Sequence, residues 1–363
     1  MIAPATAGPL TGHRLSVRNL GPNWYAAVMG TAIVATAGAA QRFQVPGLLL
    51  HAVWALSLLM LATILAGRAV HWTRHRDQAR LHLLDPGVAP FYGCLSMALL
   101  AVGAATSAVG VDLLGEHAAV VLDAVLWIAG TVIGVVAAAA VPYLMVARHR
   151  IETGSASPVW LLPVVAPMVS AATGPAFVPH LPEGQWRLAM IMGCYAFFGI
   201  SLFATLIILP VVFSRLLHGG PLPLTLTPTL FLVLGPLGQS TTALNNIAAA
   251  APLGSPEYAG AAQAFAFLYG APVMGFALLW FAFAAALVVG AVRDGMTFAM
   301  TWWGFTFPVG TCVTGAAGLA RHTGLDALFW LSAALYAFLV AAWLIALVRT
   351  VRGVASGALL PYS

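Results

Sequence analysis

Ten apolar stretches of about 20 residues or more dominate this sequence and leave little room for charge. Asp123 is the only acidic residue inside any of them, and Arg187 stands at the first position of another. Only 7% of the 363 residues are charged, whereas soluble domains carry roughly a quarter. The sequence therefore predicts an all-α membrane protein with ten transmembrane helices. The stretches cover residues 22–40, 48–67, 89–109, 119–146, 158–178, 187–213, 228–251, 259–289, 298–320 and 328–348.

The 15 arginines carry all the fixed basic charge, because the chain contains no lysine. With a cytoplasmic amino terminus, twelve lie on the cytoplasmic side, and only Arg42, Arg187 and Arg321 lie opposite. This bias predicts an even number of spans and two cytoplasmic termini. The alanine-rich, lysine-free composition indicates a bacterial inner (plasma) membrane. The predicted domains are a cytoplasmic tail at 1–21, which does not resemble a signal peptide, a ten-helix transmembrane domain at 22–348 and a cytoplasmic tail at 349–363.

Proline is concentrated in the odd-numbered spans, as at Pro90, Pro163, Pro167, Pro236 and Pro308. A proline inside a helix frees a carbonyl that lipid cannot satisfy, so we expect these spans to be kinked and to line a cavity. Most odd spans are also rich in small residues, whereas spans eight and ten are bulky and aromatic. The pattern predicts five consecutive helical hairpins, with the odd helices as an inner ring and the even helices outside.

Three segments resemble a known family: NWYAAVMGTAIVATA (23–37), GPLGQSTTALNN (235–246) and WWGFTFPVGT (302–311). The set is similar to the tellurite-resistance/dicarboxylate transporter family, which includes TehA-like proteins, fungal malate and sulfite permeases and plant guard-cell slow anion channels. The resemblance implies a homotrimer in which each protomer has a pore between its odd helices. It also implies a single gating phenylalanine, which corresponds here to Phe307, between Thr306 and Pro308. Packing of an ordinary core aromatic is the alternative for this residue.

An anion pathway requires hydrogen-bond donors without tightly binding cations, and no arginine or histidine lies in the middle of an odd span. Hydroxyl and amide groups are therefore the candidate donors, although the same groups also bond between packed helices. Gly235-Pro236 is either a helix break that offers N–H groups or a kink that offers carbonyls. The predicted pore-lining residues are Met29, Gly30, Thr31, Ser96, Pro163, Pro167, Ser170, Pro236, Gln239, Thr242, Asn246, Phe305 and Pro308. Further candidate donors are Thr36, Thr106, Thr173, Ser240, Thr241 and Asn245.

The isolated titratable residues have two interpretations each. Asp123 is either a structural partner of an interfacial group, which we favour, or a proton relay. His71 and His75 have metal-ligand spacing, but the neighbouring Arg74 and Arg76 favour a basic anchor at the membrane surface. The three cysteines lie singly inside spans, which predicts neither a disulfide framework nor a metal site.

These patterns leave two transport hypotheses open. The first is a channel for small inorganic or organic anions through a phenylalanine-gated pore. The second is a proton-coupled carrier or exporter of sulfite, malate or another C4-dicarboxylate. An enzyme is not expected, because no convergent group of His, Asp or Glu occurs at one membrane depth. We expect membrane lipids as partners, no nucleic acid and no cofactor.

Overall fold

The computed structural model describes residues 17–152 and 154–360 and is helical throughout, with no strand in these ranges. Seven of its helical segments are long and apolar enough to cross a membrane, as expected for a multi-pass membrane protein. They are Gly47–Arg74, Ala89–Leu114, Glu116–Ala147, Pro158–His180, Gln185–Gly219, Pro256–Arg293 and Asp326–Ala355.

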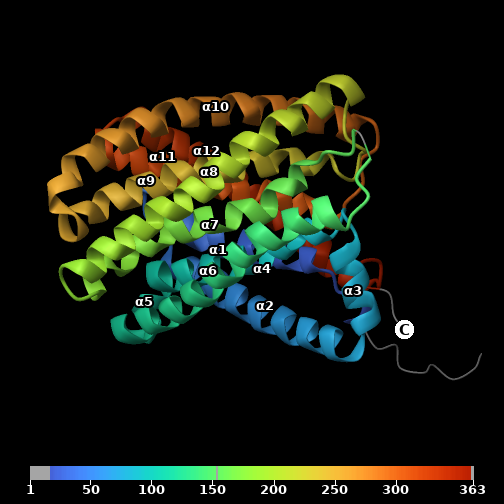
Figure 1. Cartoon of the computed structure of the whole chain (residues 1–363), viewed down its shortest axis with the longest axis horizontal. Helices are drawn as coiled ribbons and strands as arrows, with labels where there is room; N and C mark the ends of the chain where they lie inside the picture. The colour runs from blue at the N-terminus through green and yellow to red at the C-terminus, as the bar shows by residue number, and fades with distance from the viewer. Residues whose placement is uncertain (1–16, 153, 361–363) are drawn as a thin grey trace, which may run out of the picture.

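Each long helix contacts the next one along the chain, and we group the ten of them into five consecutive pairs for description (Figure 1). The pairs are α1 (Tyr25–Ala39) with α2 (Gly47–Arg74), α4 (Gly93–Ala105) with α6 (Glu116–Ala147), α7 (Leu161–Thr173) with α8 (Gln185–Gly219), α9 (Leu234–Gly254) with α10 (Ala259–Arg293), and α11 (Phe307–Thr323) with α12 (Asp326–Ala355). Two short helices, α3 (Arg76–Leu84) and α5 (Val111–Leu114), lie in the connections.

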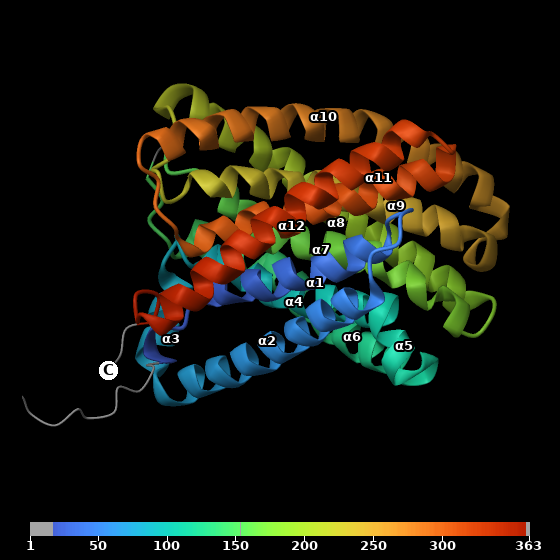
Figure 2. The ribbon, with the colours of Figure 1, turned by 180° about the vertical axis from the view of Figure 1, so that it is seen from behind.

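The first helices of these pairs also contact one another in a closed cycle. α1 contacts α4, α4 contacts α7, α7 contacts α9, α9 contacts α11, and α11 returns to α1. In the apolar windows of the segments that contain α4 and α7, 72% and 89% of residues are buried, against 22–33% for α2, α6, α8, α10 and α12. Most residues of α1, α9 and α11 are buried as well. The five cyclic helices are therefore interior, and Figure 2 shows two of the exterior helices, α10 and α2, along the upper and lower edges of the bundle.

Each interior helix begins with a short 3₁₀ segment, in which proline occupies one of the first two positions in four of the five cases. The segments are Pro22–Trp24, Ala89–Tyr92, Pro158–Trp160, Thr227–Val233 and Met300–Phe305. Proline suits the start of a helix, where its missing N–H would have had no partner.

The prolines that were expected to kink helices therefore lie at two kinds of position. Pro163 and Pro236 fall in the first turns of α7 and α9, whereas Pro167 lies inside α7. The chain remains helical through Gly235-Pro236, because Val233 and Leu234 both have αR angles and α9 continues from there. Thr306 differs, since its φ of −97° and ψ of −80° lie outside the helical region.

Glycine permits the closest helix contacts in the interior. A Cβ atom on Gly238 of α9 would overlap the backbone of Thr311 and Cys312 in α11, and one on Gly93 would overlap the backbone of Leu162. Small residues at such positions let helix backbones approach where larger side chains would hold them apart. The interior is thus packed closely enough for single residues to define its cavities.

Both ends of the described chain lie at the end of the bundle that carries α3 (Figures 1 and 2). Arg68 anchors the amino-terminal segment there by donating to the Leu20 carbonyl at 2.7 Å, and Arg18 pairs with Asp77 at 2.6 Å. The helix α12 extends to Ala355, beyond the predicted span end at 348. Residues 1–16 of the predicted N-terminal tail and residues 361–363 lie outside the described residues.

Candidate functional site

A cavity of about 300 Å³ lies among the five interior helices and α6. We call it the polar cavity, because hydroxyl, amide and charged side chains interrupt its apolar wall. Its lining residues are Ile33, Thr36, Ala40, Ala101, Ala104, Ser107, Ala108, Asp123, Val169, Ala172, Thr173, Ala176, Gln239, Thr242, Asn246, Phe307, Thr314 and Arg321.

A second cavity of about 10 Å³ lies toward the amino-terminal ends of the same helices. This small cavity is close to the minimum volume that holds one water molecule, and its side chains are apolar. Phe307 is the one residue that lines both cavities. The lining residues of the small cavity are Met29, Met97, Leu161, Leu162, Val165, Leu232, Gly235, Phe307 and Pro308.

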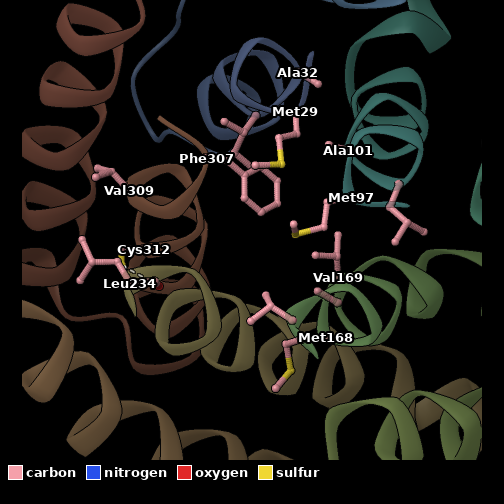
Figure 3. Close-up of a cluster of buried hydrophobic side chains, with 14 of the residues drawn as sticks. Met29, Ala32, Met97, Ala101, Met168, Val169, Leu234, Phe307, Val309 and Cys312 are labelled. Carbon is pink, nitrogen blue, oxygen red and sulfur yellow. Dashed lines mark hydrogen bonds between the residues drawn. The ribbon is translucent and has the colours of Figure 1, made fainter. Parts of the chain in front are cut away.

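The Phe307 ring points into the interior of the helix cycle. Figure 3 shows it directed toward Met29 of α1 and Met97 of α4, with Val169 of α7 close by. Its side chain is 2% exposed. The ring therefore borders both the polar cavity and the small apolar one.

The break at Thr306 determines where this ring is placed. The 3₁₀ segment Met300–Phe305 ends there, and α11 begins at Phe307 with Pro308 in its first turn. The Thr306 hydroxyl donates to the Trp303 carbonyl at 2.7 Å, and the Thr306 carbonyl accepts from the Gly310 N–H at 2.9 Å. Both ends of the break are thus held, and the phenylalanine projects from the first residue of the new helix.

Polar groups of α9 and α11 form one wall of the polar cavity. The hydroxyls of Thr242 and Thr314 lie 2.8 Å apart, and Thr242 also contacts the Gly238 carbonyl at 3.0 Å. Asn246 donates to the Ala172 carbonyl at 2.8 Å. The Gln239 side chain is 4% exposed, and its buried Oε1 has no hydrogen-bond partner among the described residues. Gln239 thus lines the cavity with an amide whose oxygen is not bonded by any described residue.

Two charged residues of opposite sign line the polar cavity, Asp123 from α6 and Arg321 from α11. Asp123 is 1% exposed and accepts a hydrogen bond from the Ser107 hydroxyl at 2.6 Å. Arg321 also lines a neighbouring hollow of about 400 Å³, together with Asn245, Gln263 and His322. The cavity thus combines one cation, one buried acid and several hydrogen-bonding groups.

The sequence profile of the voltage-dependent anion channel family matches residues 19–351, which is most of the chain. The chain belongs to this family. The match confirms the family resemblance expected from the motifs. An uncharacterized transporter of Methanocaldococcus jannaschii is 27% identical over 94% of this chain and 95% of its own length. The sulfite efflux pump of Trichophyton rubrum is 27% identical over 85% and 84%, and the malic acid transport protein of Schizosaccharomyces pombe is 29% identical over 44% and 38%.

In this member of the anion channel family, six of the predicted site residues line the two cavities. Gln239, Thr242 and Asn246 line the polar cavity, Met29 and Pro308 line the small cavity, and Phe307 lines both. The other predicted residues lie in neither lining: Gly30, Thr31, Ser96, Pro163, Pro167, Ser170, Pro236 and Phe305.

The hydroxyl residues outside the cavities bond to exterior helices. Thr31 accepts from Trp343 of α12 at 3.1 Å. Ser96 donates to the Gly130 carbonyl of α6 at 2.6 Å, and Ser170 accepts from Thr131 of the same helix at 2.9 Å. These groups hold the interior helices to the exterior ones, the alternative role considered for such groups.

Gly30 and Phe305 are packing residues in this arrangement. A Cβ atom on Gly30 would overlap the Thr306 hydroxyl, so this glycine lets α1 approach the break. The Phe305 ring packs edge-on against Phe231, with ring centroids 4.9 Å apart, and against Trp302.

Sequence reasoning missed several lining residues, of which Arg321 is the most informative. It lies just beyond the apolar stretch 298–320, while α11 continues to Thr323. The rarity of arginine on the side opposite the termini was the signal that could have found it. Ser107 and Thr314 were also missed, and they carry no comparable sequence signal.

The histidines near the end of α2 bond within the protein. His71 contacts the Val17 carbonyl through Nδ1 at 3.1 Å and stacks on His82 with ring centroids 5.2 Å apart. Within residues 17–152 and 154–360, no group of three or more His, Cys, Asp or Glu side chains is placed to hold a metal.

Proposed function

We propose that this protein passes small anions across a membrane through the interior of its helix cycle, with Phe307 as the closed gate. The observation that carries the proposal is that this ring lines both cavities, which are bordered by the same five helices. An anion that entered the polar cavity would meet the ring before reaching the small cavity. Displacement of the ring would join the two.

The character of the polar cavity supports an anion rather than a cation as the transported ion. Arg321 supplies the positive potential, and Gln239, Thr242 and Asn246 supply hydrogen-bonding groups without a fixed charge. Asp123 is the one carboxylate in the lining, and it accepts a hydrogen bond from the Ser107 hydroxyl. A cation pathway would instead be lined by rings of such acids.

A second candidate is an exporter or proton-coupled carrier of sulfite, malate or another C4-dicarboxylate. The names of the relatives favour it, since they include a sulfite efflux pump and a malic acid transport protein. Carriers bind their cargo inside a cavity and commonly use a protonatable group on the path, and Asp123 meets that requirement chemically.

The proposal includes an arrangement in the membrane. All ten long helices cross it, including α1, α9 and α11, whose shorter or more polar sequences are compensated by burial within the protein. Both termini are cytoplasmic, at the plasma membrane of a bacterium. We also propose a homotrimer, as the family resemblance implies, and native mass spectrometry of the detergent-solubilised protein tests it directly.

Flux measurements in proteoliposomes test the function. Purified protein is reconstituted, and uptake of chloride, nitrate, sulfite and malate is followed under imposed voltage and, separately, under imposed pH gradients. Uptake that exceeds the uptake of protein-free vesicles and follows the imposed voltage supports the channel. Uptake that requires a pH gradient supports the carrier. Absence of flux for all four anions, with the protein folded and inserted, would refute both.

A further inference from the structure

Asp123 occupies an unusual position for an acidic residue in a pathway for anions. Its side chain extends from the exterior helix α6 between the turns of the neighbouring interior span, where the absence of a side chain on Gly103 leaves room for Oδ1. It is 1% exposed and belongs to the lining of the polar cavity. The carboxylate is thus buried in the protein and adjacent to the space that an anion would occupy.

The hydrogen bonding of this carboxyl group is incomplete. Oδ2 accepts from the Ser107 hydroxyl at 2.6 Å, but the buried Oδ1 has no partner among the described residues. An ionised carboxylate usually accepts several hydrogen bonds, and burying one with a single donor is costly. A proton on Oδ1 would remove the buried charge and turn this oxygen into a donor.

No cation neutralises Asp123 within the described part of the chain. Among the elements packed against α6, the titratable side chains are Cys94 of α4, Asp112 of α5, Tyr92 of the 3₁₀ segment before α4, and His180 of the segment after α7. α7 itself has none. None of these groups has a hydrogen bond or ion pair with Asp123, and neither has Arg321 across the cavity.

The backbone beside Asp123 is irregular. Residues Thr106–Gly110, which include Ser107, form a π-helical turn between α4 and α5. Such turns are rare and frequently mark functional sites. Here the wider turn presents the Ser107 hydroxyl to the carboxyl group.

We propose that Asp123 is a proton-binding site of the polar cavity, so that an oxyanion occupies the cavity together with one proton. The carboxyl group takes this proton from water, is uncharged while the anion is bound, and releases the proton with the anion or back to water. The favoured ligand class is a weak-acid oxyanion, such as sulfite or a carboxylate, which can share a proton. The inference rests on the proposed function and specifies its coupling.

Charge balance is the reason for this assignment. An anion and an ionised carboxylate would repel each other strongly in a buried cavity of low dielectric, and each would reduce the occupancy of the other. Protonation of Asp123 removes the repulsion, so anion binding and proton binding favour each other by the same factor.

The test compares the wild type with Asp123→Asn in proteoliposomes at clamped voltage, with uptake measured between pH 8 and pH 5.5. Nitrate is the first probe, because its own protonation does not change in this range. Sulfite is the second, with a trapped pH-sensitive dye to count protons; because bisulfite carries a proton of its own, the count is the difference between the wild type and Asp123→Asn. We expect wild-type nitrate uptake to rise at least about fivefold toward acid pH, and sulfite to move with about one proton more in the wild type than in the variant. In Asp123→Asn, nitrate uptake should persist, independent of pH and without proton movement.

Two further variants make the result interpretable. Asp112→Asn changes an exposed acid nearby, which pairs with His51, and should leave the pH profile unchanged. Ser107→Ala removes the one hydrogen bond to the carboxylate. It should move the midpoint of the profile to higher pH, because that bond favours the ionised form.

Several outcomes would overturn the proposal. Wild-type uptake that is independent of pH and free of proton movement would refute it, while leaving anion transport itself established. An unchanged pH profile in both Asp123→Asn and Ser107→Ala would assign the proton to another group. Absence of any anion flux in the folded wild type would reject the proposed function, and this inference with it.

Discussion

Replacing Phe307 with alanine should open a continuous path between the two cavities. Opening in the wild type requires the ring to leave a site in which it is 2% exposed. Removing a buried phenylalanine from its contacts costs about 1.5–3 kcal/mol, and every 1.4 kcal/mol corresponds to a factor of ten in an equilibrium constant. In the wild type, the open state should therefore be less populated than the closed state by a factor on the order of ten to a hundred. Phe307→Ala, which has no ring to displace, should raise anion flux by that factor.

The measurement is voltage-clamped anion current or vesicle flux at equal amounts of inserted protein. Phe305→Ala is the matched control, because Phe305 is also an aromatic that is only 8% exposed, but it packs against Phe231 and Trp302 and lines neither cavity. Both variants should lose about 3–5 kcal/mol of stability, which thermal unfolding measures. Because the loss of packing is common to both, a rise in flux in Phe307→Ala alone is attributed to the gate. Equal flux in Phe307→Ala and the wild type, with both proteins folded, would refute the gate.

Three other perturbations probe the surroundings of the pathway. Arg321→Gln should lower anion flux roughly three- to tenfold at low salt, and the deficit should shrink as ionic strength screens the charge; equal flux at every salt concentration would contradict a role in attracting anions. Gly238→Ala should destabilise the protein by about 1–3 kcal/mol through overlap with the α11 backbone, whereas Gly235→Ala in the same helix, where nothing lies within 4 Å of the added atom, should not lower the melting temperature. Burial and the nearby Arg68 lower the pKa of His82 from its ordinary 6.5, so its protonation favours the unfolded state: its contribution to the stability of α3 is complete above about pH 6.5 and lost as pH falls. Backbone hydrogen exchange in α3, corrected for intrinsic rates, should therefore increase between pH 7 and pH 5 in the wild type and much less in His82→Gln.

Charge exclusion from hydrocarbon made the positions of the helices predictable from sequence. The stretch 119–146 corresponds closely to α6 at Glu116–Ala147, and 328–348 lies within α12. The interior position of the odd spans was also suggested by small residues and proline, and the burial of α4 and α7 agrees with that suggestion. These features depend on composition averaged over many residues.

The directions of individual side chains were less predictable, because an interior helix such as α1 is buried on nearly every side. α1 offers no polar stripe from which a helical phase could be deduced, and 13 of its 15 residues are buried. Thr31 and Ser96 were therefore expected in the pore, but they bond to exterior helices. A hydroxyl group in a membrane helix can either line a pathway or bond to a neighbouring helix, and only the three-dimensional packing distinguishes these two roles.

The predicted proline kinks illustrate a different limit. A proline in the first turn of a helix and a proline inside one look alike in sequence unless the helix start is known. At Pro163 and Pro236 the start was hidden, because an apolar 3₁₀ segment precedes each α-helix without a change in hydropathy. The prediction for Phe307 did not depend on knowing where a helix starts, because it came from the family resemblance.

The arrangement of the groups around Phe307 gives the proposed pathway a direction. Every charged residue of the two linings, Asp123 and Arg321, lies on the side of the polar cavity, whereas the small cavity is lined by residues such as Met29 and Leu161. An anion that arrives from the polar side can therefore be bound, and exchange a proton, before it reaches the gate. An anion from the other side must leave water among apolar side chains first, which costs more because nothing there replaces its hydration. The proposed pathway therefore places binding and selection on one side of the ring and the gate after them.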